Sequence, residues 1–118
     1  MTTQEIAERL HELCSQGQNE AAYRELFDNN AVAIEPEKSP GETWTEGLGN
    51  LLEKHTQFQN RIAEVHGASI SNPLVAGDYI SLSMFIDATY KDGSRNKMEE
   101  LCVYEVKHGK IVTEQFFY

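Results

Sequence analysis

Hydrophobic residues in the first part of the chain recur at the spacing of a helix. Thr2 and Glu5 have the spacing of a capping box, which predicts a helix that begins there and ends at Gly17. The apolar face of this helix consists of Ile6, Leu10, Leu13 and Cys14. Asn19 is expected to cap a second, short helix, which the polar run 28–30 ends. The buried side of the second helix carries Ala22, Tyr23, Leu26 and Phe27.

A short strand and a third helix are predicted next. The strand covers residues 31–35, because Pro36 cannot continue it. Residues 36–45 hold two prolines and are expected to form a loop at the rim of a pocket. Thr45 is predicted to cap the third helix. One side of that helix carries Leu48, Leu51, Leu52, His55 and Phe58.

From Ile62 onward the apolar residues alternate with a period of two, which predicts strands. The predicted strands cover residues 62–71, 74–76, 79–90, 93–106 and 111–118. Gly77-Asp78 is interpreted as a bulge or kink within one long strand. His108-Gly109-Lys110 separates the last two strands and predicts a hairpin.

Helices in the first half and an antiparallel meander in the second half are typical of an α+β fold. A length of 118 residues is sufficient for a core, so residues 1–118 are predicted to form a single domain. We expect the helices to cover one face of a strongly curved sheet. Both faces of the late strands carry large apolar residues, which favours a homodimer that packs through the sheet.

Composition and charge narrow the possible partners. Acidic residues outnumber basic ones by 19 to 10, and the net charge of −9 argues against binding to nucleic acid or to an anionic membrane surface. No stretch reaches the roughly 20 apolar residues of a membrane span, and the N-terminus lacks the pattern of a secretory signal. Cys14 and Cys102 are interpreted as small core residues of a reduced, cytoplasmic protein rather than as a disulfide.

Three segments carry a resemblance to a known superfamily. They are residues 26–36 (LFDNNAVAIEP), Gly47 at the start of the predicted third helix, and residues 103–116 with their Gly109-Lys110-Ile111 turn. In these segments the chain resembles the NTF2-like superfamily and, within it, the SnoaL-like group. The resemblance implies a cone-shaped α+β barrel, with three N-terminal helices packed on a curved, mainly antiparallel sheet. It says little about function, because this fold carries isomerases, cyclases, dehydratases, hydrolases and non-catalytic binders.

The resemblance makes Glu35 the first candidate catalytic residue. Its position before Pro36 matches the carboxylate that shuttles the proton in ketosteroid isomerase, a member of the same superfamily. The alternative is a solvated carboxylate at the end of a strand. The oxyanion-hole tyrosine of that isomerase corresponds here to Leu10, which offers no donor to an enolate. The comparison therefore does not favour steroid isomerisation.

Three carboxylates within the predicted strands are further candidates: Asp87, Glu100 and Glu114. Glu100 shares a face with Met98, Cys102 and Tyr104, while its neighbour Glu99 faces the other way. Glu114 is expected to share a face with Val112, Phe116 and Tyr118. Burial among such apolar neighbours would raise the pKa of a carboxyl group. The alternative for each carboxylate is a place at a wet dimer seam or an ion pair with Arg61, Arg95 or Lys97.

Other side chains are expected to shape a pocket around the carboxylates. These candidate ligand-binding residues are Tyr23, Trp44, His55, Glu114 and Phe116. His55 is either a pocket acid or base, or a residue at the edge of the core with a satisfied hydrogen bond. Trp44 either caps the pocket or anchors its loop. The chain has no His-x-His, Cys-x-x-Cys or phosphate-binding glycine loop, so neither a metal nor a cofactor is predicted.

These residues leave three kinds of function open. The first is a cofactor-free isomerase, cyclase or dehydratase that binds a small hydrophobic carbonyl compound and moves a proton through Glu35 or Glu100. The second is a module that binds a small ligand without catalysis. The third is a protein-interaction domain similar to nuclear transport factor 2.

Overall fold

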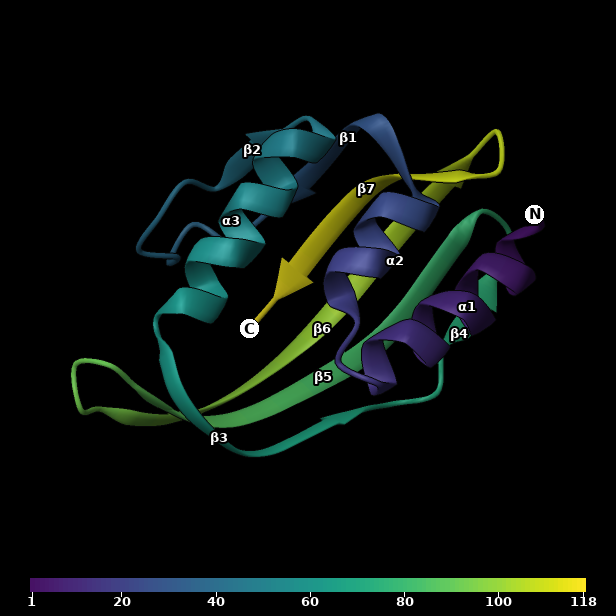
Figure 1. The fold of residues 1–118 in the computed structure, drawn as a ribbon. Coiled ribbons are helices and arrows are strands. Elements are labelled where there is room, and N and C mark those ends of the chain that lie inside the picture. The colour runs from purple at the N-terminus through teal and green to yellow at the C-terminus, as the bar shows by residue number, and fades with distance from the viewer.

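The computed structural model describes all 118 residues, which form three helices and seven strands. The three helices lie on one side of a single curved sheet (Figure 1). In chain order the elements are α1 (Thr3–Ser15), α2 (Asn19–Leu26), β1 (Phe27–Ile34), β2 (Trp44–Glu46), α3 (Leu48–Asn60), β3 (Ile62–Ile70), β4 (Leu74–Ala76), β5 (Tyr79–Tyr90), β6 (Arg95–Lys107) and β7 (Lys110–Phe117).

The sheet has the strand order β2-β1-β7-β6-β5-β3, and β4 pairs with β5 as well. All strand pairs are antiparallel except β1 with β7, which run parallel, so the sheet is mixed. The α+β prediction is confirmed. The cone-shaped barrel with three N-terminal helices that the resemblance implied is matched only in part. The sheet is open, with β2 and β3 at its edges. Two helices precede the sheet, and α3 follows β1 and β2 along the chain, as the order of predicted elements indicated.

The helix ends follow local chemistry. The predicted capping box of α1 is present: the Thr2 side chain accepts a hydrogen bond from the Glu5 N–H, and the Glu5 side chain accepts one from the Thr2 N–H. Gly17 follows the helix with φ of +73°, a conformation that favours glycine. The predicted cap of α3 is wrong, because the N-cap residue is Gly47 and Thr45 is a buried residue of β2.

The strands of the second half lie close to their predicted positions. Gly77-Asp78 is not a bulge, however, but a two-residue turn between β4 and β5, since Ala76 pairs with Tyr79. β1 begins at Phe27, earlier than predicted, because residues 28–30 belong to the strand and do not separate it from α2 as a loop. Register shifts that were not predicted interrupt the pairing of β1 with β7, of β3 with β5 and of β6 with β7. In the last pair Glu105 pairs with Thr113 but Val106 pairs with Ile111, so Val112 is an extra residue in β7 that forms a bulge.

Alternation along the strands gives the sheet two unlike faces. The face toward the helices, here the concave face, carries Ala33, Ile80, Leu82, Cys102 and Tyr104, which pack against Ile6, Leu10, Leu26 and Leu51 of the helices. The opposite, convex face carries Phe85, Asp87, Glu99, Leu101 and Val103. None of the three helices has the length and hydrophobicity that a membrane span requires.

Candidate functional site

Three carboxylates meet on the concave face of three neighbouring strands. Glu114 in β7 lies beside Ala33 of β1 and opposite Tyr104 of β6. Glu100 is on the same face of β6 as Tyr104, four residues earlier, and Glu35 directly follows β1. The sheet therefore brings Glu35, Glu100 and Glu114 together, although they are far apart in the sequence.

Glu35 is held by two partners. Lys54 Nζ of α3 lies 2.8 Å from Glu35 Oε1, and the side chain of Glu35 is only 12% exposed. The Tyr118 hydroxyl donates a hydrogen bond to Glu35 Oε2 at 2.9 Å. Both carboxylate oxygens of Glu35 are thus engaged by donors of the protein itself.

Glu100 is a half-buried carboxylate without a cationic partner. Burial raises its pKa to about 7, and the negative charge of Glu35 adds to the increase. The Cys102 thiol, with its Sγ 3.9 Å from Glu100 Oε1, and the charge of Lys54 oppose this shift. A carboxyl group with this pKa exists in both protonation states near neutral pH, as a general acid or base requires.

Glu114 is the most deeply buried of the three, with 4% of its surface exposed. Burial raises its pKa to about 8, although the Tyr23 hydroxyl donates a hydrogen bond to its Oε1 at 2.8 Å and lowers the pKa. Glu114 is therefore mainly protonated at neutral pH. Its second oxygen has no hydrogen-bond partner in the protein, which leaves it available to a ligand.

Aromatic side chains line the same region. The Phe27 ring lies 4.6 Å from that of Tyr23 and 6.2 Å from that of Tyr104, measured between ring centroids. Burial raises the pKa of both tyrosines, so their hydroxyls remain protonated donors. The centroid of the His55 ring lies 5.8 Å from that of Tyr23, with the two rings tilted by 51°, and burial lowers the pKa of this histidine. His55 is thus a half-buried, neutral side chain beside Tyr23.

Two predicted site residues lie elsewhere. Asp87 is on the convex face, where Arg95 holds both of its oxygens, at 3.1 and 2.9 Å. These hydrogen bonds from Arg95 lower the pKa of Asp87. Trp44 is 58% exposed in the edge strand β2. Phe116, in contrast, packs against the core next to Cys102 on the concave face.

Three residues of this region were not predicted as site residues: Lys54, Tyr104 and Tyr118. The position of Lys54 on the apolar face of α3 could have been predicted, because it follows Leu51 by three residues and precedes Phe58 by four. Tyr104 and Tyr118 share the two-residue period of Glu100 and Glu114, so their positions on this face could be predicted. The ion pair of Lys54 with Glu35 required the relative placement of α3 and β1.

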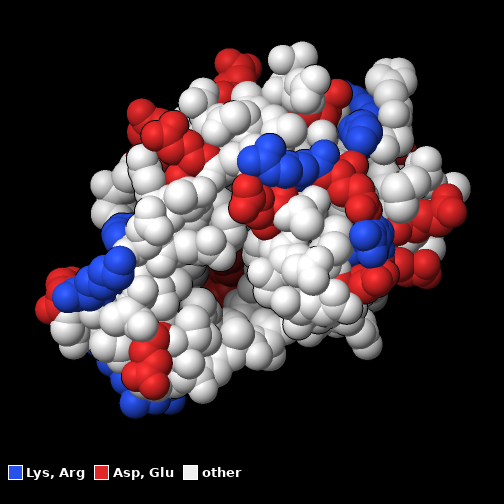
Figure 2. Space-filling view, in the orientation of Figure 1, with Lys and Arg blue, Asp and Glu red and all other residues white.

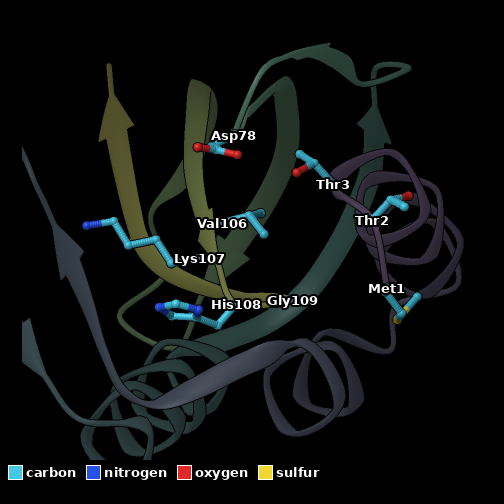
Figure 3. Close-up of a pocket in the computed structure, with 8 residues that line it drawn as sticks. All are labelled: Met1, Thr2, Thr3, Asp78, Val106, Lys107, His108 and Gly109. Atoms are coloured by element: carbon cyan, nitrogen blue, oxygen red, sulfur yellow. The ribbon is translucent and has the colours of Figure 1, made fainter.

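A hollow opens toward this region. Figure 2 shows it near the centre of the view, with atoms of Asp or Glu (red) at its floor. Two other hollows have defined linings. One, about 350 Å³, lies between the start of α1, the β4–β5 turn and the β6–β7 turn (Figure 3). The other, about 370 Å³, is apolar and lies around Leu74 and Tyr79. Neither contains a carboxylate of the concave face.

The donors of the chain do not form a compact metal site. No group of three or more His, Cys, Asp or Glu side chains is arranged closely enough to hold a metal ion.

Comparison with known proteins identifies the family. The SnoaL-like domain matches residues 1–118. The chain belongs to the SnoaL-like domain family. A SnoaL-like protein from Mesorhizobium loti, described as a candidate polyketide cyclase and also labelled a carbohydrate phosphatase, is 35% identical, with a TM-score of 0.89 over 100% of both chains.

More distant solved structures share the fold. A candidate polyketide cyclase from Jannaschia sp. CCS1 is 13% identical, with a TM-score of 0.75 over 98% of this chain and 83% of that protein. A candidate isomerase from Bacillus subtilis is 18% identical, with a TM-score of 0.73 over 98% of this chain and 88% of its own. A search of curated protein sequences gives no match.

Proposed function

We propose that this SnoaL-like protein is a cofactor-free isomerase, cyclase or dehydratase that transfers a proton within a small hydrophobic carbonyl compound. The observation that carries this proposal is Glu100, a carboxylate in an apolar setting whose pKa is raised to about 7. The description of the Mesorhizobium loti protein as a candidate polyketide cyclase supports it, since SnoaL-type cyclases resemble this chain in their single acid/base carboxylate.

Glu100 is the proton shuttle in this proposal. Its ionised form removes a proton from the carbon next to the substrate carbonyl, and the electron pair of that C–H bond moves toward the carbonyl oxygen to form an enolate. Glu100 then returns the proton to another carbon or oxygen of the same molecule. The protein is unchanged at the end, so the step needs no oxidant, reductant or second substrate.

Glu114 supplies the donor that Leu10 cannot. Leu10 is a core residue with 2% of its surface exposed. A protonated Glu114, oriented by Tyr23, can donate its hydrogen to the developing enolate oxygen, and such donation in a water-poor site contributes strongly to catalysis. Because the proton on Glu114 is required, a pKa near 8 keeps the donor in place at neutral pH.

Glu35 is a positioning residue in this proposal. Its resemblance to the isomerase base had made it the first candidate catalytic residue. Lys54 and Tyr118 occupy both of its oxygens, which makes it a poor acceptor for a substrate proton. Its negative charge raises the pKa of Glu100 and so strengthens that residue as a base.

The test is proton exchange with solvent, which does not require the natural substrate. We would incubate a panel of small cyclic and aromatic ketones with the protein in deuterium oxide and follow loss of the α-proton signals by NMR. Glu100→Gln should slow the catalysed exchange by about 10² to 10⁴-fold. The matched control is Glu99→Gln, which changes the adjacent, exposed carboxylate on the convex face. Equal rates for Glu100→Gln and wild type would overturn the assignment.

The pH profile of exchange gives a second measurement. The rate should rise with pH as Glu100 ionises near 7 and fall as Glu114 loses its proton near 8, which gives a bell-shaped curve. Glu114→Gln should abolish the decline on the alkaline side. A ketone that binds saturably to the wild type but is never exchanged would instead support the ligand-binding module.

We further propose that two copies pair through the convex face. Leu101 and Phe117 lie directly opposite each other on neighbouring strands and are each nearly half exposed. Lys97 and Glu105 on the same strand face give it charges of both signs, so a second copy in the opposite orientation is complementary. Light scattering should give the mass of a dimer for the wild type and of a monomer for Leu101→Asp; a monomeric wild type refutes the pairing.

A further inference from the structure

The region around the three carboxylates contains more acid than its own cations can neutralise. Lys54 is the one cationic side chain bonded to any of them, and its Nζ is bonded to Glu35. Glu100 and Glu114 have no ion-pair partner. His55 adds no positive charge at neutral pH, because burial lowers its pKa. Two buried carboxyl groups therefore remain without a counter-charge.

One buried polar atom in the same place lacks a partner. Glu114 is 4% exposed, the Tyr23 hydroxyl donates a hydrogen bond to its Oε1, and its second oxygen has no hydrogen-bond partner in the protein. Every side-chain nitrogen or oxygen that is fully enclosed has a partner, so this second oxygen retains some contact with open space. Buried polar groups are normally satisfied, and an oxygen left free beside a hollow points to a ligand.

The chemistry of this ligand follows from the surrounding groups. Glu100 and Glu114 have no ion-pair partner in the protein, so a cationic group on the ligand is the complement of their charge. The rings of Tyr23, Phe27 and Tyr104 pack together, the Tyr23 hydroxyl bonds Glu114, and aromatic faces attract ammonium groups. We infer that this site binds an organic ammonium compound, with its cationic nitrogen between Glu100 and Glu114 and beside the half-buried ring of Tyr23.

This inference deepens the proposed function, because it makes the substrate a carbonyl compound that also carries a cationic nitrogen. A cation next to Glu100 favours the ionised form of this carboxyl group, which is the form that accepts a proton. Binding of the substrate would then activate the base. Glu114, which is more deeply buried and bonded to Tyr23, would keep its proton longer and remain the donor.

Cation binding should release protons from the site. At pH values below their raised pKa values, Glu100 and Glu114 are protonated, and an ammonium ion binds best when they ionise. Affinity should therefore increase with pH, by up to about tenfold per pH unit for each proton released. The other titratable side chains around these two groups are Glu35, Lys54, His55, Tyr23, Cys14, Cys102, Tyr104 and Tyr118.

The experiment compares choline with 3,3-dimethylbutan-1-ol, which has the same shape with carbon in place of the charged nitrogen. Choline does not titrate in this range, so any pH dependence belongs to the protein. Isothermal titration calorimetry at pH 6, 7.5 and 9, in buffers of different ionisation enthalpy, measures both affinity and proton release. We expect choline to bind at least tenfold more tightly than the alcohol at pH 9, and to release protons at pH 6.

Variants locate the binding. Glu100→Gln and Glu114→Gln should each weaken choline binding at least tenfold at pH 9 and reduce proton release, while Glu99→Gln on the convex face should leave both unchanged. Near-ultraviolet circular dichroism checks that each variant is folded. Equal affinity for choline and the alcohol, no choline binding at pH 9, or binding that neither site variant weakens would each overturn the inference.

The two proposals fail separately. A protein that exchanges ketone protons but does not prefer choline is a proton-transfer enzyme for uncharged substrates. A protein that binds choline with proton release but exchanges no ketone protons has the cation site without the proposed catalysis.

Discussion

Two acidic side chains of the same sheet, Asp87 and Glu114, are almost equally buried and yet titrate in opposite directions. Asp87 is 8% exposed on the convex face and Glu114 is 4% exposed on the concave face. Arg95 donates two hydrogen bonds to Asp87 and lowers its pKa. Glu114 has only a tyrosine hydroxyl as donor, and burial raises its pKa to about 8.

The comparison shows that the partner, rather than burial alone, decides the charge of a buried carboxyl group. On the convex face the carboxylate is neutralised by the protein itself, and the pair has no capacity left for a ligand. On the concave face the counter-charge is missing. The same sheet thus has one face that serves stability and another where a stability cost is retained at a candidate site.

The largest expected effect tests the difference in packing between the two faces. Leu82 on the concave face is 2% exposed, and Leu82→Ala should lower the free energy of unfolding by about 2–5 kcal/mol through loss of packing and a cavity. Leu101 on the convex face is 46% exposed, and Leu101→Ala should change it by less than about 0.5 kcal/mol in the monomer. Urea unfolding at low protein concentration measures both; similar losses would show that the convex face is covered.

The next effect tests the cost of burying Glu114. Its pKa in the folded protein, about 8, lies above its ordinary value of 4.5, so the folded protein retains a proton that the unfolded chain releases between these pH values. Stability therefore falls as pH rises through this window, by at most about 1.4 kcal/mol per pH unit. Glu114→Gln should be more stable than wild type at pH 9, on the order of 2 kcal/mol, and similar at pH 4. If the stability of the wild type and of Glu114→Gln changed with pH in the same way, the raised pKa of Glu114 would be wrong.

A smaller effect concerns the hydrogen bond that orients Glu114. Tyr23→Phe removes one hydroxyl without changing the packed ring, and should cost about 1 kcal/mol at neutral pH. Because the Tyr23 hydroxyl lowers the pKa of Glu114, its removal should move that pKa upward. NMR of ¹³C-labelled glutamate carboxyl groups can follow the titration, with Tyr79→Phe at an exposed hydrogen bond as the control. An unchanged pKa of Glu114 in Tyr23→Phe would show that the Tyr23 hydroxyl does not influence this carboxyl group.

The smallest effect is expected on the convex face. The pKa of Asp87 lies below its ordinary value of 3.8, so its pairing with Arg95 stabilises the fold above that pH and stops doing so as pH falls through the folded-state pKa. Arg95→Met should lower the melting temperature slightly at pH 7, and the difference from wild type should disappear at acid pH. Arg95 is more than half exposed, so only a small contribution to stability is expected. A large decrease in the melting temperature of Arg95→Met at pH 7 would show that this pair stabilises the fold more than an ordinary surface ion pair.

The strands and helices could be predicted largely from periodicity, because burial on one face repeats every two or every 3.6 residues. The alternation of Glu99 and Glu100 correctly separated the two faces of β6. The beginning of β1 could not be predicted, since the polar residues 28–30 are half-buried or exposed on a strand whose neighbours, Phe27 and Ala31, are buried. Local composition favoured a break, and the pairing of Phe27 and Val32 with β7 on either side of these residues overrode it.

The site was less predictable than the fold. Glu100 and Glu114 were recognised as carboxylates on apolar faces, and their titration follows from the burial that this pattern implies. Asp87 has a similar apolar context, but it pairs with Arg95, which lies opposite Thr89 on the next strand. Which carboxylate finds a cation depends on strand register and on helix placement, as the ion pair of Lys54 with Glu35 also shows. These relations are tertiary and have no signal in the local sequence.

The bulge at Val112 connects the packing of the core with the composition of the site. In a regular strand Ile111 and Glu114 would point to opposite sides of β7, since they are three positions apart. The bulge changes the phase of the strand, so that one end supplies a core residue and the other end supplies an acid to the same face. Pairing the same residues without a bulge would turn half of β7 by 180°, whereas deleting Val112 would leave Ile111 and Glu114 two positions apart and still on one face. An unpaired residue without chemistry of its own therefore sets the phase that brings Glu114 into the site.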